Sequence, residues 1–276
     1  MGNLDPRVVE AYENEWTSYG HDALPQGELR ELFEEQFELF PWDSLPRDAV
    51  GFDIGCGGGE MAQFVAPRVG KLVCIDPSNA AVENAKRLLD GVGNCEFHVA
   101  AIDAMPIPDA TMDFGYCMGV LPYLPDPLNG LKSCVEKLKP NAPFLLTAAY
   151  TLENRPLWFR ALGGAADLIR RIVSRQPRPV REAAVSAIAF GVYLPLARFA
   201  LLLETLGLDV DGFPLSSYRR GSFRRLRDGA YRFAMPLEKR CSVDQLKQMM
   251  SEAGLQRIVF SQTVYSRALG YTNTQS

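Results

Sequence analysis

The sequence has only two histidines, and none of its six cysteines stands in a C-x-x-C pair or another metal-ligand spacing. No metal site is therefore predicted. A basic excess is also missing, because the formal net charge is −4, which argues against nucleic-acid binding. The N-terminus lacks the apolar run after a basic start that marks a secretory signal. We expect the cysteines to be reduced thiols, and together with the missing secretory signal they predict a cytoplasmic protein.

The middle of the chain alternates short apolar runs with amphipathic segments, from Val50 to about residue 150. The expected strands are VGFDIG, KLVCID, EFHVAAID, MDFGYCMGV and APFLLTAAY, and the expected helices between them are MAQFVAPRV, NAAVENAKRLL and LNGLKSCVEKLK. This alternation is typical of an α/β fold with helices on both faces of a parallel sheet. We therefore predict a Rossmann-like, doubly wound, mostly parallel seven-stranded sheet. Ligands bind such sheets at the carboxyl ends of the strands.

The flanking regions predict three further parts around this core, which we place at residues 48–152. Residues 1–47 read as an N-terminal helical cap. Residues 153–235 break the alternation with two helical stretches, about 156–175 and 181–206, and read as a lid insertion. Residues 236–276 begin with a capping box at Ser242 and Gln245 and are expected to complete the core sheet.

The strongest local signal is a glycine loop, Asp53-Ile54-Gly55-Cys56-Gly57-Gly58-Gly59-Glu60, directly after an apolar strand. Its glycines allow a tight turn and a close backbone approach to a ligand. The spacing differs from the G-x-G-x-x-G of dinucleotide enzymes, and the acid at Glu60 repels a phosphate but not a sulfonium cation. A second acid, Asp76, ends the next strand, where a carboxylate can accept both hydroxyls of a ribose.

These segments resemble the class I S-adenosylmethionine (SAM)-dependent methyltransferases, in particular those of ubiquinone and menaquinone biosynthesis, over about residues 48–150. DIGCGGGE resembles the first motif of the family, CIDPS the second, and AIDAMPIPDATMDFGYCMGVLPYLPDP the third and fourth segments. The resemblance implies that SAM is the cofactor and that Asp76 binds its ribose, with Pro77 near the adenine. It further implies that Asp103 accepts a hydrogen bond from the adenine amino group, with Ala104 beside it. The methionine and ribose portions would be wrapped by Asp53, Gly55, Cys56 and Gly57, and the methionine side would be lined by Met118 and Gly119.

The acceptor side departs from the family. Many relatives have paired histidines after the fourth strand, where this chain has Pro122 and Tyr123. Transfer to an alcohol needs a general base. Our candidates for the catalytic role are His21, in the turn after the first helical stretch, and Tyr123. Trp16, on that first stretch, is a candidate substrate contact.

The insertion is expected to determine the substrate. Six arginines concentrate among aromatic residues between Tyr218 and Phe233, and they read either as a solvated face or as a site where Arg219 and Arg224 capture a carboxylate or phosphate. The apolar stretch 183–203 and its amphipathic neighbour LWFRALGGAADLIRRIV read either as a buried lid over an apolar substrate or as a surface that docks on a membrane.

The sequence thus predicts a SAM-dependent methyltransferase that transfers a methyl group to O, N or C of a small-molecule acceptor, apolar or anionic, in secondary metabolism. Another SAM-dependent reaction and a non-catalytic regulatory partner are the alternatives. The oligomeric state does not follow from the sequence.

Overall fold

A computed structural model describes residues 2–19, 24–148, 156–210, 212–261 and 266–274. The chain divides into two compact units. The core unit comprises residues 1–21, 29–154 and 237–276, and the helical unit comprises residues 22–28 and 155–236.

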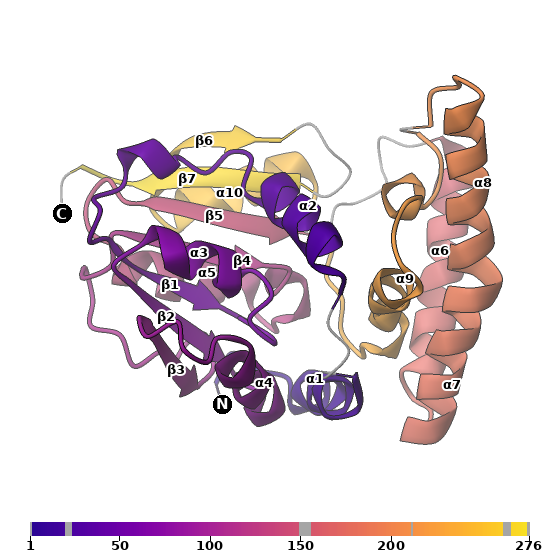
Figure 1. The fold of residues 1–276 in the computed structure, drawn as a ribbon, viewed down its shortest axis with the longest axis horizontal. Helices are drawn as coiled ribbons and strands as arrows, with labels where there is room; N and C mark the ends of the chain where they lie inside the picture. Colours follow the sequence, from indigo (N-terminus) through magenta and orange to yellow (C-terminus); the bar gives the residue numbers. More distant parts are fainter. Residues whose placement is uncertain (1, 20–23, 149–155, 211, 262–265, 275–276) are drawn as a thin grey trace. The chain divides into compact units, whose positions relative to one another are not determined.

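The core unit is built on one seven-stranded sheet with the order β3-β2-β1-β4-β5-β7-β6 (Figure 1). Its strands are β1 (Val50–Ile54), β2 (Lys71–Asp76), β3 (Cys95–Val99), β4 (Phe114–Met118), β5 (Pro143–Ala148), β6 (Leu255–Phe260) and β7 (Ser266–Thr272). The first five strands pair in parallel, and β7 pairs antiparallel with both β5 and β6. The predicted doubly wound, mostly parallel sheet is confirmed.

Two apolar layers cover the faces of this sheet, because successive side chains of a strand point to opposite sides. On one face, Phe52 and Ile54 of β1 join a cluster with α5 (Pro127–Lys137) and α10 (Val243–Glu252). On the other face, Phe114 and Tyr116 of β4 join a cluster with α2 (Gln26–Gln36), α3 (Ala62–Val65) and α4 (Asn79–Leu88). The site described below lies where β1 and β2 end between these layers.

The remaining elements of the core unit are the helix α1 (Pro6–Tyr19) and the short turns η1 (Trp42–Ser44), η2 (Ala66–Arg68) and η3 (Leu121–Tyr123). The helix predicted over MAQFVAPRV is wrong in length: α3 has four residues, and the chain continues as the 3-10 turn η2, which contains Pro67. A proline lacks the N–H that an α-helix needs.

The helical unit contains α6 (Leu157–Val173), α7 (Arg178–Ile188), the π-helical turn η4 (Ala189–Tyr193), α8 (Leu194–Thr205), η5 (Ser216–Tyr218), α9 (Phe223–Ala230) and η6 (Tyr231–Ala234). α7, η4 and α8 follow one another without a break and form one long helix, with α6 beside it (Figure 1). This continuous stretch, Arg178–Thr205, is long and apolar enough to cross a membrane by length and composition, and 28% of its most apolar window is buried.

Candidate functional site

The glycine loop follows β1 and turns back across the end of β2. The amides of Gly55 and Cys56 both donate to the carbonyl oxygen of Ile75, at 2.7 and 3.1 Å. Gly55 has φ of +74°, and a Cβ at this position would lie 2.1 Å from Cγ2 of Val120. Backbone strain and this clash both require glycine here. The loop therefore presents its main chain, without side chains, at the carboxyl ends of two parallel strands.

Asp76 anchors this loop from the end of β2. Its Oδ2 accepts the amide of Gly57 at 3.1 Å, and its Oδ1 accepts the amide of Ser78 at 2.8 Å. The side chain is buried, and burial raises its pKa to about 6, against the lowering effect of these two bonds. A carboxylate oxygen has two acceptor sites, so each oxygen of Asp76 can accept one more hydrogen bond. This geometry fits the two hydroxyls of a ribose.

Asp53 is the last residue but one of strand β1, directly before the glycine loop. The hydroxyl of Tyr116, on neighbouring β4, donates to its Oδ2 at 2.9 Å. Burial raises the pKa of Asp53 to about 8; the Tyr116 bond opposes this, and the negative charge of Asp76 adds to it. A cation bound near the loop would favour the ionised form of both acids, because opposite charges stabilise one another in a buried site. The residues present therefore fit SAM, which carries both a ribose and a positive sulfonium.

Helix α1 covers the loop. A Cβ on Gly57 would lie 2.7 Å from Cζ2 of Trp16, and one on Gly58 would lie 2.7 Å from its Cζ3. The indole therefore rests directly on the glycine backbone. The side chain of Asn84 on α4 donates to the carbonyl oxygen of Trp16 at 3.1 Å, which fixes the indole's position along the loop.

Glu13, which sequence reasoning missed, holds α1 to the start of α4. Its carboxylate accepts the hydroxyl of Ser78 at 2.5 Å and the amide of Ala80 at 3.2 Å. Ser78 is the N-cap of α4, so an acid here also meets the positive end of a helix dipole. An acidic residue on an amphipathic helix carries no signal in the sequence that would separate it from a solvated one.

The adenine-side acid Asp103 is held by the N-terminal segment. The amide of Asn3 donates to its Oδ2 at 2.5 Å, while the Asn3 side chain exchanges hydrogen bonds with the main chain of Asp126 at 2.6 and 2.8 Å. Asp103 and the neighbouring Ala104 are exposed. The interaction of Asp103 with the adenine amino group stays a prediction, and Asn3 is a second residue that sequence reasoning missed.

The remaining predicted cofactor contacts lie on the same rim. Pro77 follows Asp76 directly and is partly buried, and Cys56 is buried, with burial contributing to a pKa of about 11 for its thiol. Met118 ends β4. Gly119 follows it with φ of +73° and open space where a Cβ would be. The structure thus brings the predicted residues to the ends of β1, β2 and β4, while their individual roles stay predictions.

Tyr123, a candidate catalytic residue, lies in η3 after β4. Its ring meets that of Tyr12 on α1 edge to face, with centroids 5.6 Å apart. Burial raises the pKa of Tyr12 well above its usual value, and the neighbouring Tyr123 adds to the effect. Tyr12 therefore stays protonated near neutral pH and cannot accept a proton there. The other candidate, His21, lies outside the described residues.

The arginines proposed as anion contacts belong to the helical unit, where both already pair with acids. Arg219 contacts Glu204 at 2.8 Å, and Arg224 contacts Asp228 one helical turn away at 3.2 Å. Their role in substrate capture stays a prediction. Within the described ranges, no group of three or more His, Cys, Asp or Glu side chains could hold a metal ion.

A cavity of about 400 Å³ opens elsewhere in the core unit, against α10. Leu121 and Pro122 of η3, Ala148 at the end of β5, and Cys241 contribute to its lining. The three acids predicted to hold the cofactor, Asp53, Asp76 and Asp103, are not among its lining residues. We therefore do not place the cofactor in it.

Comparison with known proteins places this site in a family. Residues 52–146 match the family described as methyltransferase domain. A ubiquinone biosynthesis O-methyltransferase from Xanthomonas axonopodis pv. citri is 27% identical over 201 residues, which cover 71% of this chain and 78% of the relative. The mitochondrial enzyme of the same name from Schizosaccharomyces pombe is 36% identical over 110 residues, 38% of this chain and 40% of the relative.

Solved structures show the same fold at low identity. A SAM-dependent methyltransferase from Thermotoga maritima superimposes with a TM-score of 0.52 at 12% identity and covers 96% of this chain and all of that one. A chain from the complex between the Haloferax volcanii Trm112 methyltransferase activator and a methyltransferase gives a TM-score of 0.53 at 13% identity, with coverage of 94% and 98%. The solved structures show the fold, while the family match over residues 52–146 and the named relatives, together with the glycine loop and its paired acids, support a class I SAM-dependent methyltransferase of the type 11 group.

Proposed function

We propose that this methyltransferase acts on a hydroxyl group of a small, largely apolar acceptor. The observation that carries the proposal is the likeness to proteins named ubiquinone biosynthesis O-methyltransferase, which extends over 71% of the chain and so beyond the cofactor-binding segments. The aromatic side chains of Trp16 and the Tyr12–Tyr123 pair beside the glycine loop support an acceptor with an apolar body.

SAM supplies an electrophilic methyl group on a sulfonium. The chain supplies position: Asp76 and the glycine loop hold the ribose and methionine portions, and α1 with Trp16 keeps water from the loop. Alignment of two reactants in a dry site supplies much of the rate of such a displacement. The C–O bond forms as the C–S bond breaks, and the hydroxyl proton leaves for a base.

For that base we propose His21 or Tyr123, the residues of suitable chemistry that the sequence places near the rim. Tyr123→Phe keeps the ring contact with Tyr12 and removes only the hydroxyl. If Tyr123 moves the proton, this change lowers kcat and shifts its pH profile while leaving the affinity for SAM unchanged. His21→Ala tests the alternative in the same way, and an unaltered pH profile in both variants would reject both assignments.

The decisive experiment uses methyl-labelled SAM with hydroxylated aromatic and aliphatic acceptors. Asp76→Ala should abolish transfer, and Asp90→Ala, an exposed acid just beyond α4, is the matched control. Labelled methyl ethers from the wild type confirm O-methyl transfer. Tight SAM binding without transfer to any acceptor would instead favour the non-catalytic regulatory role.

We also propose a cytoplasmic location. All six cysteines are free, and Cys74, Cys117 and Cys134 are fully buried. Buried free thiols behave as small apolar side chains and persist in a reducing compartment.

A further inference from the structure

The helical unit exposes an unusual amount of apolar surface on α6 and on the long helix formed by α7, η4 and α8. We call this surface the apolar face; it consists of Trp158, Leu162, Leu168, Ile169 and Ile172 of α6 and of Val180, Phe190, Val192, Phe199, Leu202 and Leu206 of the long helix and its end. Trp158 is 58% exposed and Phe190 67%. Large apolar residues exposed in such number on two neighbouring helices mark an interaction surface.

In α6 one basic side chain is buried while several large apolar side chains are exposed. Arg170 points inward, only 8% exposed, and its Nη1 donates to the carbonyl oxygen of Met235 at 3.1 Å. Its neighbours Ile169 and Ile172 are 43% and 55% exposed. A helix that faces water places its charges outward and its apolar stripe inward. The exposed isoleucines of α6 depart from this arrangement, which points to an apolar partner on the outward side of the helix.

Polar contacts hold the opposite side of the long helix within the helical unit. Arg227 of α9 pairs with Glu182 at 2.7 Å, and the hydroxyl of Tyr193 donates to the carbonyl oxygen of Gly229 at 3.2 Å. These contacts, which run along α7 and η4, would have to break if this helix crossed a bilayer.

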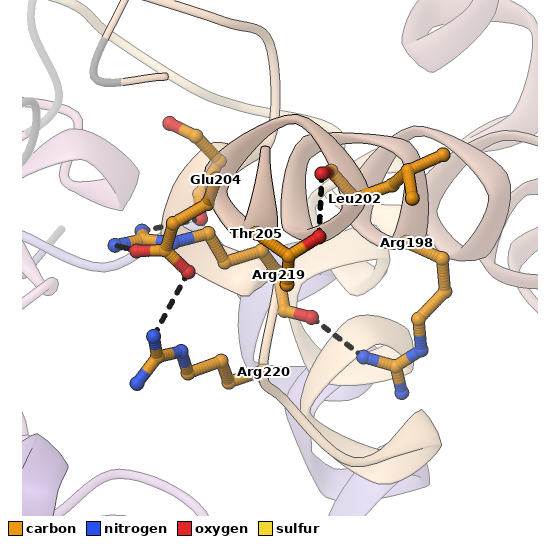
Figure 2. Close-up of polar contacts among 7 residues, drawn as sticks. Arg198, Leu202, Glu204, Thr205, Arg219 and Arg220 are labelled. Atoms are coloured by element: carbon orange, nitrogen blue, oxygen red, sulfur yellow. Dashed lines mark hydrogen bonds and ion pairs between the residues drawn. The ribbon is translucent and has the colours of Figure 1, made fainter. Parts of the chain in front are cut away.

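The end of the same helix is held in the same way (Figure 2). Arg198 donates to the carbonyl oxygen of Arg219 at 2.7 Å and to that of Gly221 at 3.0 Å. The carboxylate of Glu204 accepts hydrogen bonds from Arg219 at 2.8 Å and from Arg220 at 2.9 Å. The charges of α8 thus turn toward η5 and the segment after it, while Phe199 and Leu202 stay exposed. One side of the long helix thus makes polar contacts within the helical unit, and the other side exposes apolar side chains to solvent. Such a helix is suited to lie along a boundary between water and an apolar phase.

The charge of the insertion selects the occupant. Residues 155–236 contain 14 arginines, no lysine and six acidic residues, although the whole chain has a net charge of −4. Arg160, Arg171 and Arg175 of α6 and the turn after it are exposed. A second copy packed on this face about a two-fold axis would present the same basic surface. A bilayer with anionic headgroups instead offers these arginines opposite charge and accepts the apolar side chains between its acyl chains.

We propose that the helical unit docks on an anionic lipid bilayer through the apolar face, with α6 and the long helix lying in the plane of the interface. The aromatic side chains Trp158, Phe190 and Phe199 enter the boundary between headgroups and acyl chains, and the exposed arginines of α6 contact lipid phosphates. This inference is independent of the acceptor and goes beyond methyl transfer.

The test is co-sedimentation of the full chain with phosphatidylcholine vesicles, with and without about one-third phosphatidylglycerol. We expect binding to the anionic vesicles that weakens in high salt. Phe190→Glu with Leu202→Glu should lower the partition coefficient about tenfold or more. Val92→Glu, at an exposed valine of the core unit, should leave it unchanged.

A second pair of substitutions tests the charges. Arg171→Gln with Arg175→Gln should lower the partition coefficient on anionic vesicles by about tenfold and leave the weak binding to neutral vesicles unaltered. SAM binding and circular dichroism of each variant verify that the protein is folded.

Three results would overturn the proposal. The wild type could fail to sediment with anionic vesicles. It could form a dimer in analytical ultracentrifugation that Phe190→Glu dissociates, which would assign the apolar face to a second copy. Resistance of membrane-bound protein to alkaline carbonate extraction would show a helix that crosses the bilayer.

Discussion

The affinity for SAM should depend on the ionisation of Asp76, and Asp76→Ala measures how much. Each ribose hydroxyl would donate a hydrogen bond to a carboxylate oxygen that already accepts one amide. Hydrogen bonds to a charged group contribute about 1.5–3 kcal/mol each. Loss of two of them gives about 3–6 kcal/mol, which corresponds to an increase in Kd of about 100-fold to 10,000-fold. Isothermal titration with SAM and S-adenosylhomocysteine measures this directly.

The pH dependence follows from the same residue. Burial raises the pKa of Asp76 to about 6, so the protein holds a proton there below that pH. The hydroxyls of the ribose donate to the ionised form, so binding must release the proton. The affinity should therefore fall by about tenfold per pH unit below an inflection near 6, and the ionisation of Asp53 adds a further rise toward pH 8.

Asp76→Asn provides the discriminating control. The amide keeps the volume of the side chain but cannot ionise, so affinity is weak at all pH values and the inflection near 6 disappears. An unchanged inflection in this variant would assign it to another group. Wild-type affinity in Asp76→Ala, in a protein whose thermal unfolding matches that of Asp90→Ala, would refute the assignment of Asp76 to the ribose.

Three further substitutions test the framework of the site. Glu13→Ala removes the acceptor of the Ser78 hydroxyl and should cost about 1–2 kcal/mol of α1 docking, seen as faster hydrogen exchange in α1 and weaker SAM binding. Tyr116→Phe removes the donor whose hydrogen bond opposes the burial effect and keeps the pKa of Asp53 from rising beyond about 8. Stability declines with pH between the unfolded and folded pKa values, so in this variant the decline continues further: denaturant unfolding should show a loss of about 1–3 kcal/mol that is larger at pH 8.5 than at pH 6.5. Arg267→Ala empties a fully buried site in β7 and should cost about 2–4 kcal/mol in denaturant unfolding at any pH from 6 to 8, and a loss below 1 kcal/mol would contradict this.

Much of the fold follows from patterns that span a few residues. The alternation of apolar runs and amphipathic segments predicted the parallel sheet, because strand and helix periodicities differ locally. The glycine loop and Asp76 lie at one rim because two parallel strands end there, which the topology dictates. Pro67 is a sequence signal for the end of α3, but the apolar residues on either side of it favoured one longer helix.

The contacts that complete the site join residues far apart in the sequence. Glu13 reaches Ser78 and Tyr116 reaches Asp53 across more than sixty residues, and Asn3 reaches Asp103 across a hundred. No local pattern distinguishes such a glutamate, tyrosine or asparagine from one that faces solvent. Their positions depend on tertiary packing, so they become visible only in the folded structure.

The chain is acidic as a whole, but its basic and acidic residues are distributed unevenly between residues 155–236 and the rest, which bears on both proposals. Outside residues 155–236 the chain has 15 basic and 27 acidic residues, and inside that range it has 14 and six. An acidic core suits a cationic methyl donor, for which Asp53 and Asp76 are the predicted contacts. In the basic insertion, several arginines pair internally with Glu182, Glu204 and Asp228, which reduces the charge available to a long polyanion such as RNA. The arginines left at the surface beside the apolar face need a partner that is anionic and apolar at once, and a lipid surface has both properties.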